Sequence, residues 1–165
     1  MKQSELKAIL KDHKLWFQSD GKQGKRADLR GTDLGVAYLQ DVNLAGADLE
    51  GANLTGADLT DASLYGANLT DADLARANLC NANLTDADLH GANLTGANLT
   101  GADLTGVEMG DANLEGAKFT TNFKKVGWFY GATFSEDQIL WVALNPKYPK
   151  WAHTLKWVKA KADAA

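Results

Sequence analysis

The sequence has little of what most small folds depend on. It contains a single cysteine, Cys80, and two prolines among 165 residues, which excludes an internal disulfide framework. No apolar run approaches the ~20 residues of a membrane-spanning helix, and the N-terminal residues lack the apolar core of a secretory signal. We therefore expect a reducing, cytoplasmic location without membrane contact.

Between residues 27 and 121 the sequence also lacks both the helical period and sustained strand alternation. Instead, every fifth residue from Leu29 to Phe119 is large and apolar, which gives nineteen units in register. Two residues earlier stands a small residue, usually alanine, with Thr32, Val42 and Val107 as exceptions. Asp or Asn mostly lies between the two columns, and the unit ends in residues that favour bends. This pattern predicts a solenoid that coils around its own Leu and Ala side chains.

Units such as Ala57-Asp58-Leu59-Thr60-Asp61 carry an A(D/N)LXX motif. Over roughly residues 27–121 the chain resembles the pentapeptide repeat proteins, whose signature this is. The resemblance implies an all-β solenoid, a right-handed quadrilateral parallel β-helix with the central Leu and the preceding Ala inside. The four sides rest on the resemblance alone, because the sequence shows a period of five but no clear period of twenty. Four units per coil would give almost five coils, a rod of ~25 Å.

The charges are distributed unevenly along the chain. Residues 27–121 carry a net charge of −12, whereas residues 1–26 and 122–165 carry +4 each, within a total of −4. Phosphate groups repel an acidic rod, so we expect no direct binding of nucleic acid.

Both ends of the rod need a cover, because a β-helix leaves strand edges and core open there. We predict three regions: an N-terminal capping helix and loop at 1–26, the repeat at 27–134 and a C-terminal helical cap at 135–165. Ser4 is the expected N-cap of the first helix. Its apolar face is predicted from helical spacing and consists of Leu6, Ile9, Leu10, His13 and Phe17.

At the other end the five-residue phase continues at Phe129 and Phe134. Lys124 stands where Leu is expected, which predicts a bulge that turns Phe123 inward. The C-terminal cap should begin at the capping box Ser135-Glu136-Asp137-Gln138.

No catalytic, cofactor or metal site is predicted, and the chain is interpreted as a non-enzyme. His13, His90 and His153 lie in three different segments, and Cys80 has no basic neighbour in the pattern that would stabilise a thiolate. Pairs such as Asp71/Asp73 and Asp86/Asp88 occupy regular positions of the five-residue unit, so solvation explains them better than metal binding.

The sequence predicts a rigid rod that acts as a protein–protein interaction or structural module with an unknown protein partner. Aromatic residues gather near the C-terminus and either plug the open core or contact a partner or a second copy in a homodimer. The candidate contact residues are Trp128, Tyr130, Trp141, Trp151 and Trp157.

A DNA mimic that modulates DNA gyrase or topoisomerase, as fluoroquinolone-resistance pentapeptide proteins do, is the alternative, which the −12 charge of the rod favours. Those proteins favour Phe at the central position, and some carry loop insertions. This chain has Leu at nearly all these positions and no inserted loop within 27–121.

Overall fold

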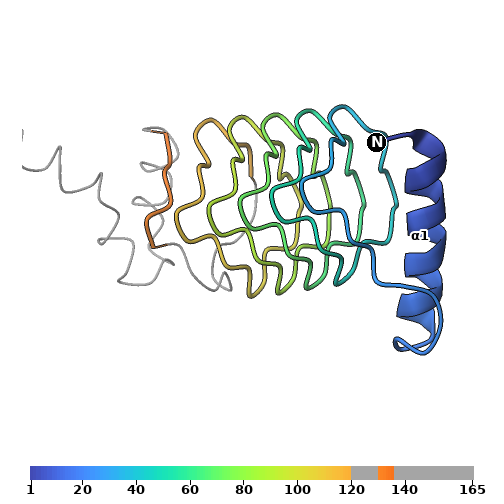
Figure 1. The fold of residues 1–165 in the computed structure, drawn as a ribbon. Helices are drawn as coiled ribbons and strands as arrows, with labels where there is room; N and C mark the ends of the chain where they lie inside the picture. The colour runs from blue at the N-terminus through green and yellow to red at the C-terminus, as the bar shows by residue number, and fades with distance from the viewer. Residues whose placement is uncertain (120–129, 136–165) are drawn as a thin grey trace, which may run out of the picture.

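The computed structural model describes residues 1–119 and 130–135, which form a helix followed by a rod of stacked coils (Figure 1). The helix, α1 (Gln3–Gln18), lies at one end of the rod. The predicted bulge at Phe123 and Lys124 and the predicted C-terminal helical cap lie outside the described residues.

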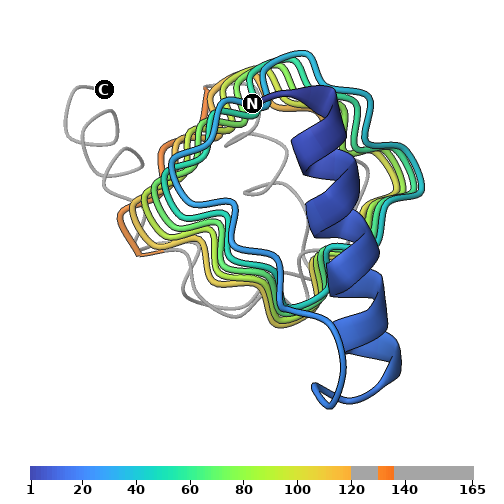
Figure 2. The same ribbon diagram turned by 45° about the vertical axis from the view of Figure 1, so that its right-hand side comes forward.

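Successive coils pair in parallel with a register of twenty residues. The pairs run from Asp28 with Asp48 to Asn113 with Thr133, each joining one residue to the residue twenty positions later. The N–H of Leu49 donates to the carbonyl of Asn68 (2.7 Å). Twenty residues are four units, so each coil has four sides, as Figure 2 shows in a view tilted toward the rod axis.

Each corner is a tight turn closed by a backbone hydrogen bond. The N–H of Ala52, for example, donates to the carbonyl of Leu49 (3.0 Å). The residue before the alanine has a positive φ, 62° at Gly51 and 57° at Asp61, as the third residue of a type II turn requires. This explains why the last position of the unit is Gly, Asp or Asn in most copies.

The interior of the rod is filled by the two apolar columns. The leucines from Leu29 to Leu104 have exposed fractions of 0–4%, and the alanines of the column before them are almost all as well buried. Phe134 resumes the phase after residues 120–129: it packs against this core and meets Phe119 edge-on, with 6.5 Å between ring centroids. The predicted Leu and Ala spine is therefore confirmed.

α1 lies across the open end of the first coil (Figure 2) and packs Leu6, Ile9 and Leu10 against the core. The prediction of Ser4 as the N-cap is wrong. The helix begins at Gln3, because the Glu5 carboxylate accepts the N–H of Lys2 (3.1 Å) and satisfies the first turn from there.

The expected place of Phe17 on the buried face is also wrong, since its side chain is 47% exposed. Trp16 faces inward instead: its ring stacks on the buried His13, with centroids 5.4 Å apart, and would touch a Cβ added at Gly46. Trp16, three residues after His13, therefore faces the first coil, whereas Phe17, four residues after it, faces solvent.

No helix among the described residues is long and apolar enough to cross a membrane.

Candidate interaction surface: the acidic face

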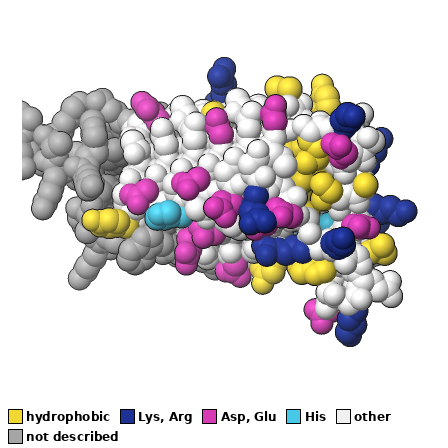
Figure 3. Space-filling view, in the orientation of Figure 1, with side chains coloured by type: hydrophobic (Ala, Val, Ile, Leu, Met, Phe, Trp, Pro, Cys, Tyr) yellow, Lys and Arg dark blue, Asp and Glu magenta, His cyan; other side chains and the backbone are white. Residues whose placement is uncertain are grey.

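The register of twenty sorts the outward side chains into four faces of different charge. One face, here called the acidic face, is formed by residues 27–31, 47–51, 67–71, 87–91 and 107–111. It holds seven of the fifteen acidic residues of 27–121 and one arginine, a net charge of −6. Its acidic residues are Asp28, Asp48, Glu50, Asp71, Asp88, Glu108 and Asp111. Figure 3 shows Asp and Glu side chains along the rod, and Lys and Arg gathered mainly at the α1 end.

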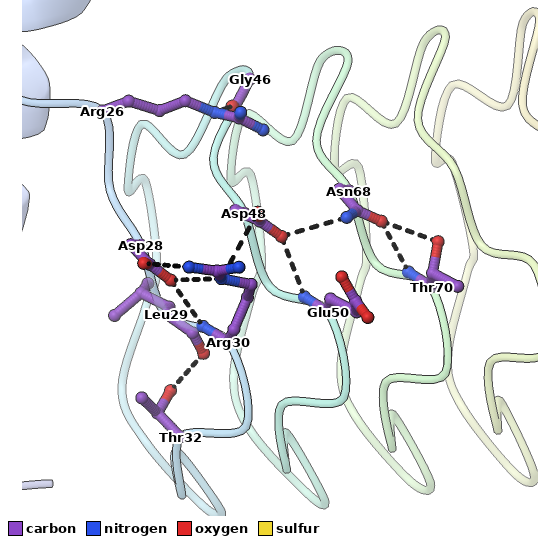
Figure 4. A network of polar contacts seen from close by, with 10 residues as sticks. All are labelled: Arg26, Asp28, Leu29, Arg30, Thr32, Gly46, Asp48, Glu50, Asn68 and Thr70. Carbon is purple, nitrogen blue, oxygen red and sulfur yellow. Dashed lines mark hydrogen bonds and ion pairs between the residues drawn. The ribbon is translucent and has the colours of Figure 1, made fainter.

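Near α1 this charge is partly neutralised by Arg30 (Figure 4). The guanidinium contacts both oxygens of Asp28, at 2.9 and 2.7 Å, and lies 3.7 Å from the carboxylate of Asp48. The side-chain hydrogen bond from Arg30 lowers the pKa of Asp28 to about 2. Both partners of the first pair are well exposed, so the contact orients the side chains more than it stabilises the rod.

Further along, hydrogen bonds between and within coils fix the column of Asp and Asn residues that precedes the leucines of this face (Figure 4). Asp48 Oδ1 accepts from the side-chain amide of Asn68 at 3.0 Å, and Asn68 Oδ1 accepts from the hydroxyl of Thr70 at 2.7 Å. The same oxygen accepts the N–H of Thr70 at 3.1 Å, which is an Asx turn. The polar groups of this column are therefore presented in fixed positions.

Toward the far end the face keeps its negative charge. His90 Nε2 lies 3.7 Å from the Asp111 carboxylate, and the backbone N–H of His90 donates to Asp88 Oδ1 at 2.9 Å. No Lys or Arg of the described residues pairs with Asp71, Asp88 or Glu108. Nor do the described residues contain a group of three or more His, Cys, Asp or Glu that could hold a metal ion.

The residues selected from sequence are distributed elsewhere. Cys80 is half-buried on the face opposite the acidic face, where its backbone N–H donates to Asn78 Oδ1 at 3.3 Å. Tyr130 is 66% exposed at the far end of the rod. The other four candidate contact residues, Trp128, Trp141, Trp151 and Trp157, lie outside the described residues.

Sequence reasoning missed the acidic face. It recorded the −12 charge as a property of the whole rod, although sorting the acidic residues by position within each block of twenty reveals their bias to one side. That step needs the coil length, which the register now supplies.

A model of the family described as pentapeptide repeats matches eight copies, over residues 25–61, 37–74, 62–101 and 82–120. The chain belongs to the pentapeptide repeat family. Its fold is accordingly the right-handed quadrilateral β-helix of this family.

Solved structures of other pentapeptide repeat proteins are similar to this one. A protein of the Arabidopsis thaliana thylakoid lumen is 31% identical, with a TM-score of 0.57, over 76% of this chain and 83% of that one. Rfr23 of the cyanobacterium Cyanothece 51142 is 29% identical, with a TM-score of 0.47, over 68% and 83%. QnrB1, a plasmid-mediated fluoroquinolone resistance protein, is 16% identical, with a TM-score of 0.43, over 75% and 74%. No curated protein matches this pentapeptide repeat protein.

Proposed function

We propose that this pentapeptide repeat protein is a non-catalytic rod that binds a basic surface of another protein through its acidic face. The observation that carries the proposal is the gathering of seven of the fifteen acidic residues of 27–121 on one of four sides. Charges lined up on one side of a rigid body attract and orient a basic partner before contact.

The interior supports a binding role. Leu29 to Leu104 are buried at 0–4% exposure and nearly all the alanines before them at 0–6%, so over the rod a partner meets the outward columns of Asp, Asn, Thr and Gly. Because these columns are held by turns and ladders, little side-chain freedom is lost on binding, which favours affinity. The cytoplasmic location stays a prediction, as does a homodimer through the aromatic C-terminal end.

The test neutralises one face and compares it with an equal change elsewhere. Asn occupies the same column in many units, so Asp→Asn keeps the Asx turn while it removes the charge. The face variant combines Asp48→Asn, Glu50→Gln, Asp88→Asn and Glu108→Gln. The control variant combines Asp73→Asn, Asp86→Asn, Asp103→Asn and Glu115→Gln on the other faces.

Each full-length protein is immobilised and exposed to a lysate of its source organism, and the bound proteins are identified by mass spectrometry. We expect the wild type and the control variant to retain the same partner and the face variant to lose it. Equal retention by both variants would show that total charge, rather than this face, is recognised, and the proposal would fail.

The same face supports a second candidate, a DNA mimic that binds DNA gyrase. A row of carboxylates along a rod resembles a phosphate backbone in charge. This candidate predicts that the wild type inhibits gyrase supercoiling or protects it from ciprofloxacin, and that the face variant does so less. No effect of the wild type at micromolar concentration removes the candidate.

A further inference from the structure

The first coil departs from the repeat at the corner formed by Val36. At this position of the later coils stand Gly56, Arg76, Gly96 and Gly116, all with positive φ like Val36 itself, whose φ is 50°. A β-branched residue is unfavourable in this conformation, and residues held there cluster at functional positions. The side chain is also 74% exposed, so burial in the core does not explain why valine is present.

Tyr38 is a second departure, two residues later. In the later coils Asp58, Asn78 and Asn98 accept the N–H of the residue two positions on, at 3.1–3.3 Å. A phenol cannot close this turn, since its oxygen lies far from the backbone. The ring is 86% exposed. Two neighbouring positions thus give up a favoured local conformation and instead expose an apolar side chain.

Four carboxylates lie on the two sides of the rod that meet at Val36. Asp33 and Asp41 flank the pair in the first coil, and Asp58 and Asp61 lie beneath Tyr38 and Asp41 in the second coil, because the register joins Tyr38 to Asp58. Hydrogen bonds, first that from the Thr60 hydroxyl, hold the pKa of Asp58 below its usual range. Among the described residues no Lys or Arg forms an ion pair with these four. Figure 3 shows exposed hydrophobic side chains gathered mainly at this end of the rod.

We infer that Val36 and Tyr38, with Asp33, Asp41, Asp58 and Asp61, form a docking patch for residues 147–161 of a second copy of the chain. That stretch lies outside the described residues, but its sequence is complementary to the patch. It contains five lysines, Trp151 and Trp157, and no acidic residue. Lysines meet the four carboxylates and the Tyr38 ring, which attracts cations, while tryptophan covers the apolar centre.

To reach the patch within its own molecule, the stretch would have to run back along the whole rod, so we assign the occupant to a second molecule. The patch lies in the coil next to α1, and the last described residues, 130–135, lie at the opposite end (Figure 1). A tail that leaves one end and docks at the other joins rods head to tail, a heterologous contact that extends beyond a dimer. The patch is separate from the acidic face, so this inference stands independently of the proposed function.

The test measures the mass of the full-length chain by sedimentation velocity across a wide concentration range. The patch variant is Val36→Gly with Tyr38→Asn, which restores residues found at these positions in later coils and therefore keeps the fold. The matched control is Tyr65→Asn, which removes another outward tyrosine of the rod, 47% exposed. We expect the wild type and the control to self-associate as concentration rises, and the patch variant to remain a monomer.

A labelled peptide of residues 147–161 provides the second measurement. It should bind the wild-type chain, dissociate its assemblies and bind the patch variant about tenfold more weakly, a difference of about 1.4 kcal/mol. Added salt should weaken binding. A wild type that stays monomeric, a patch variant that still self-associates or a peptide that binds both chains equally would overturn the inference.

Discussion

The backbone N–H of Ala27 donates a hydrogen bond to Nδ1 of His13 at 3.1 Å. This bond joins the buried side chain of α1 to the residue at which the first coil begins. Only a neutral imidazole accepts it, since both nitrogens of a protonated ring are donors. Burial lowers the pKa of His13 from 6.5, the Ala45 carbonyl raises it and the charge of Arg26 lowers it further.

The first prediction concerns pH. Because the pKa of His13 is lower in the folded than in the unfolded chain, the unfolded chain binds the proton more readily. The stability contributed by α1 is therefore complete above pH 6.5 and falls as the pH drops through that value toward the lower folded pKa. Thermal melts of the wild type should decline over this interval, and His13→Gln should flatten the decline. His90→Gln, at an exposed histidine, is the control, and an unchanged slope in His13→Gln would contradict the assignment.

The second prediction concerns the loop after α1. A Cβ at Gly24 would lie 2.1 Å from the carbonyl oxygen of Asp12, whereas one at Gly31 would meet nothing within 4 Å. Both have positive φ, so Gly→Ala at either position carries a conformational cost of about 1 kcal/mol. Gly24→Ala should destabilise further by displacing α1, seen as faster hydrogen exchange in residues 3–18. Equal effects of the two substitutions would show that the close approach is not maintained.

The third prediction concerns the asparagine ladder. Asn78 donates to Thr60 Oγ1 at 2.8 Å, accepts from the side chain of Asn98 at 3.0 Å and accepts the N–H of Cys80. Asn83, which is exposed, accepts the N–H of Thr85 at 3.0 Å. Asn78→Ala should lower the free energy of unfolding by about 2 kcal/mol and Asn83→Ala by about 1 kcal/mol. Urea unfolding measures both, and the reverse order would count against ladders between coils.

The fourth prediction concerns the direction in which side chains point. Leu79 is fully buried, so Leu79→Lys places an unpaired charge in the core and should destabilise by more than about 4 kcal/mol. Thr100 stands in an outward column, and Thr100→Lys should change stability by less than about 0.5 kcal/mol. Denaturant midpoints compare the two, and similar losses would mean that the inward and outward columns are assigned wrongly.

The interior was predictable from the sequence because buried positions accept only apolar side chains and so form a strict pattern. A charged residue is excluded at the buried position of Leu79 but is tolerated at the outward position of Thr100. The corners were also predictable, since residues such as Gly51 and Asp61 tolerate positive φ. The number of sides was predicted only from the family resemblance, because the sequence has no clear period of twenty that shows where one coil ends and the next begins. The acidic face depends on that coil length and was therefore missed.

Other features were missed because local rules were outweighed by contacts. Ser4 is a better N-cap than Lys2 by propensity, yet the helix begins after Lys2, because the Glu5 carboxylate accepts the Lys2 N–H. Phe17 has the helical spacing of the buried face, but Trp16 is the residue over the coil. Val36 and Tyr38 do break their columns in the sequence, and a comparison of each column with its consensus would have found them.

A coil of twenty residues is the central claim, because every face and every contact between coils depends on it. The most direct test compares the thermal melts of two deletions, 67–86 and 67–72. Removing four units joins Gly66 to Ala87 in register, so the first deletion should give a shorter rod with a cooperative melt. Removing six residues shifts every later leucine out of phase and should abolish that transition. Equal melts for the two deletions would contradict the account.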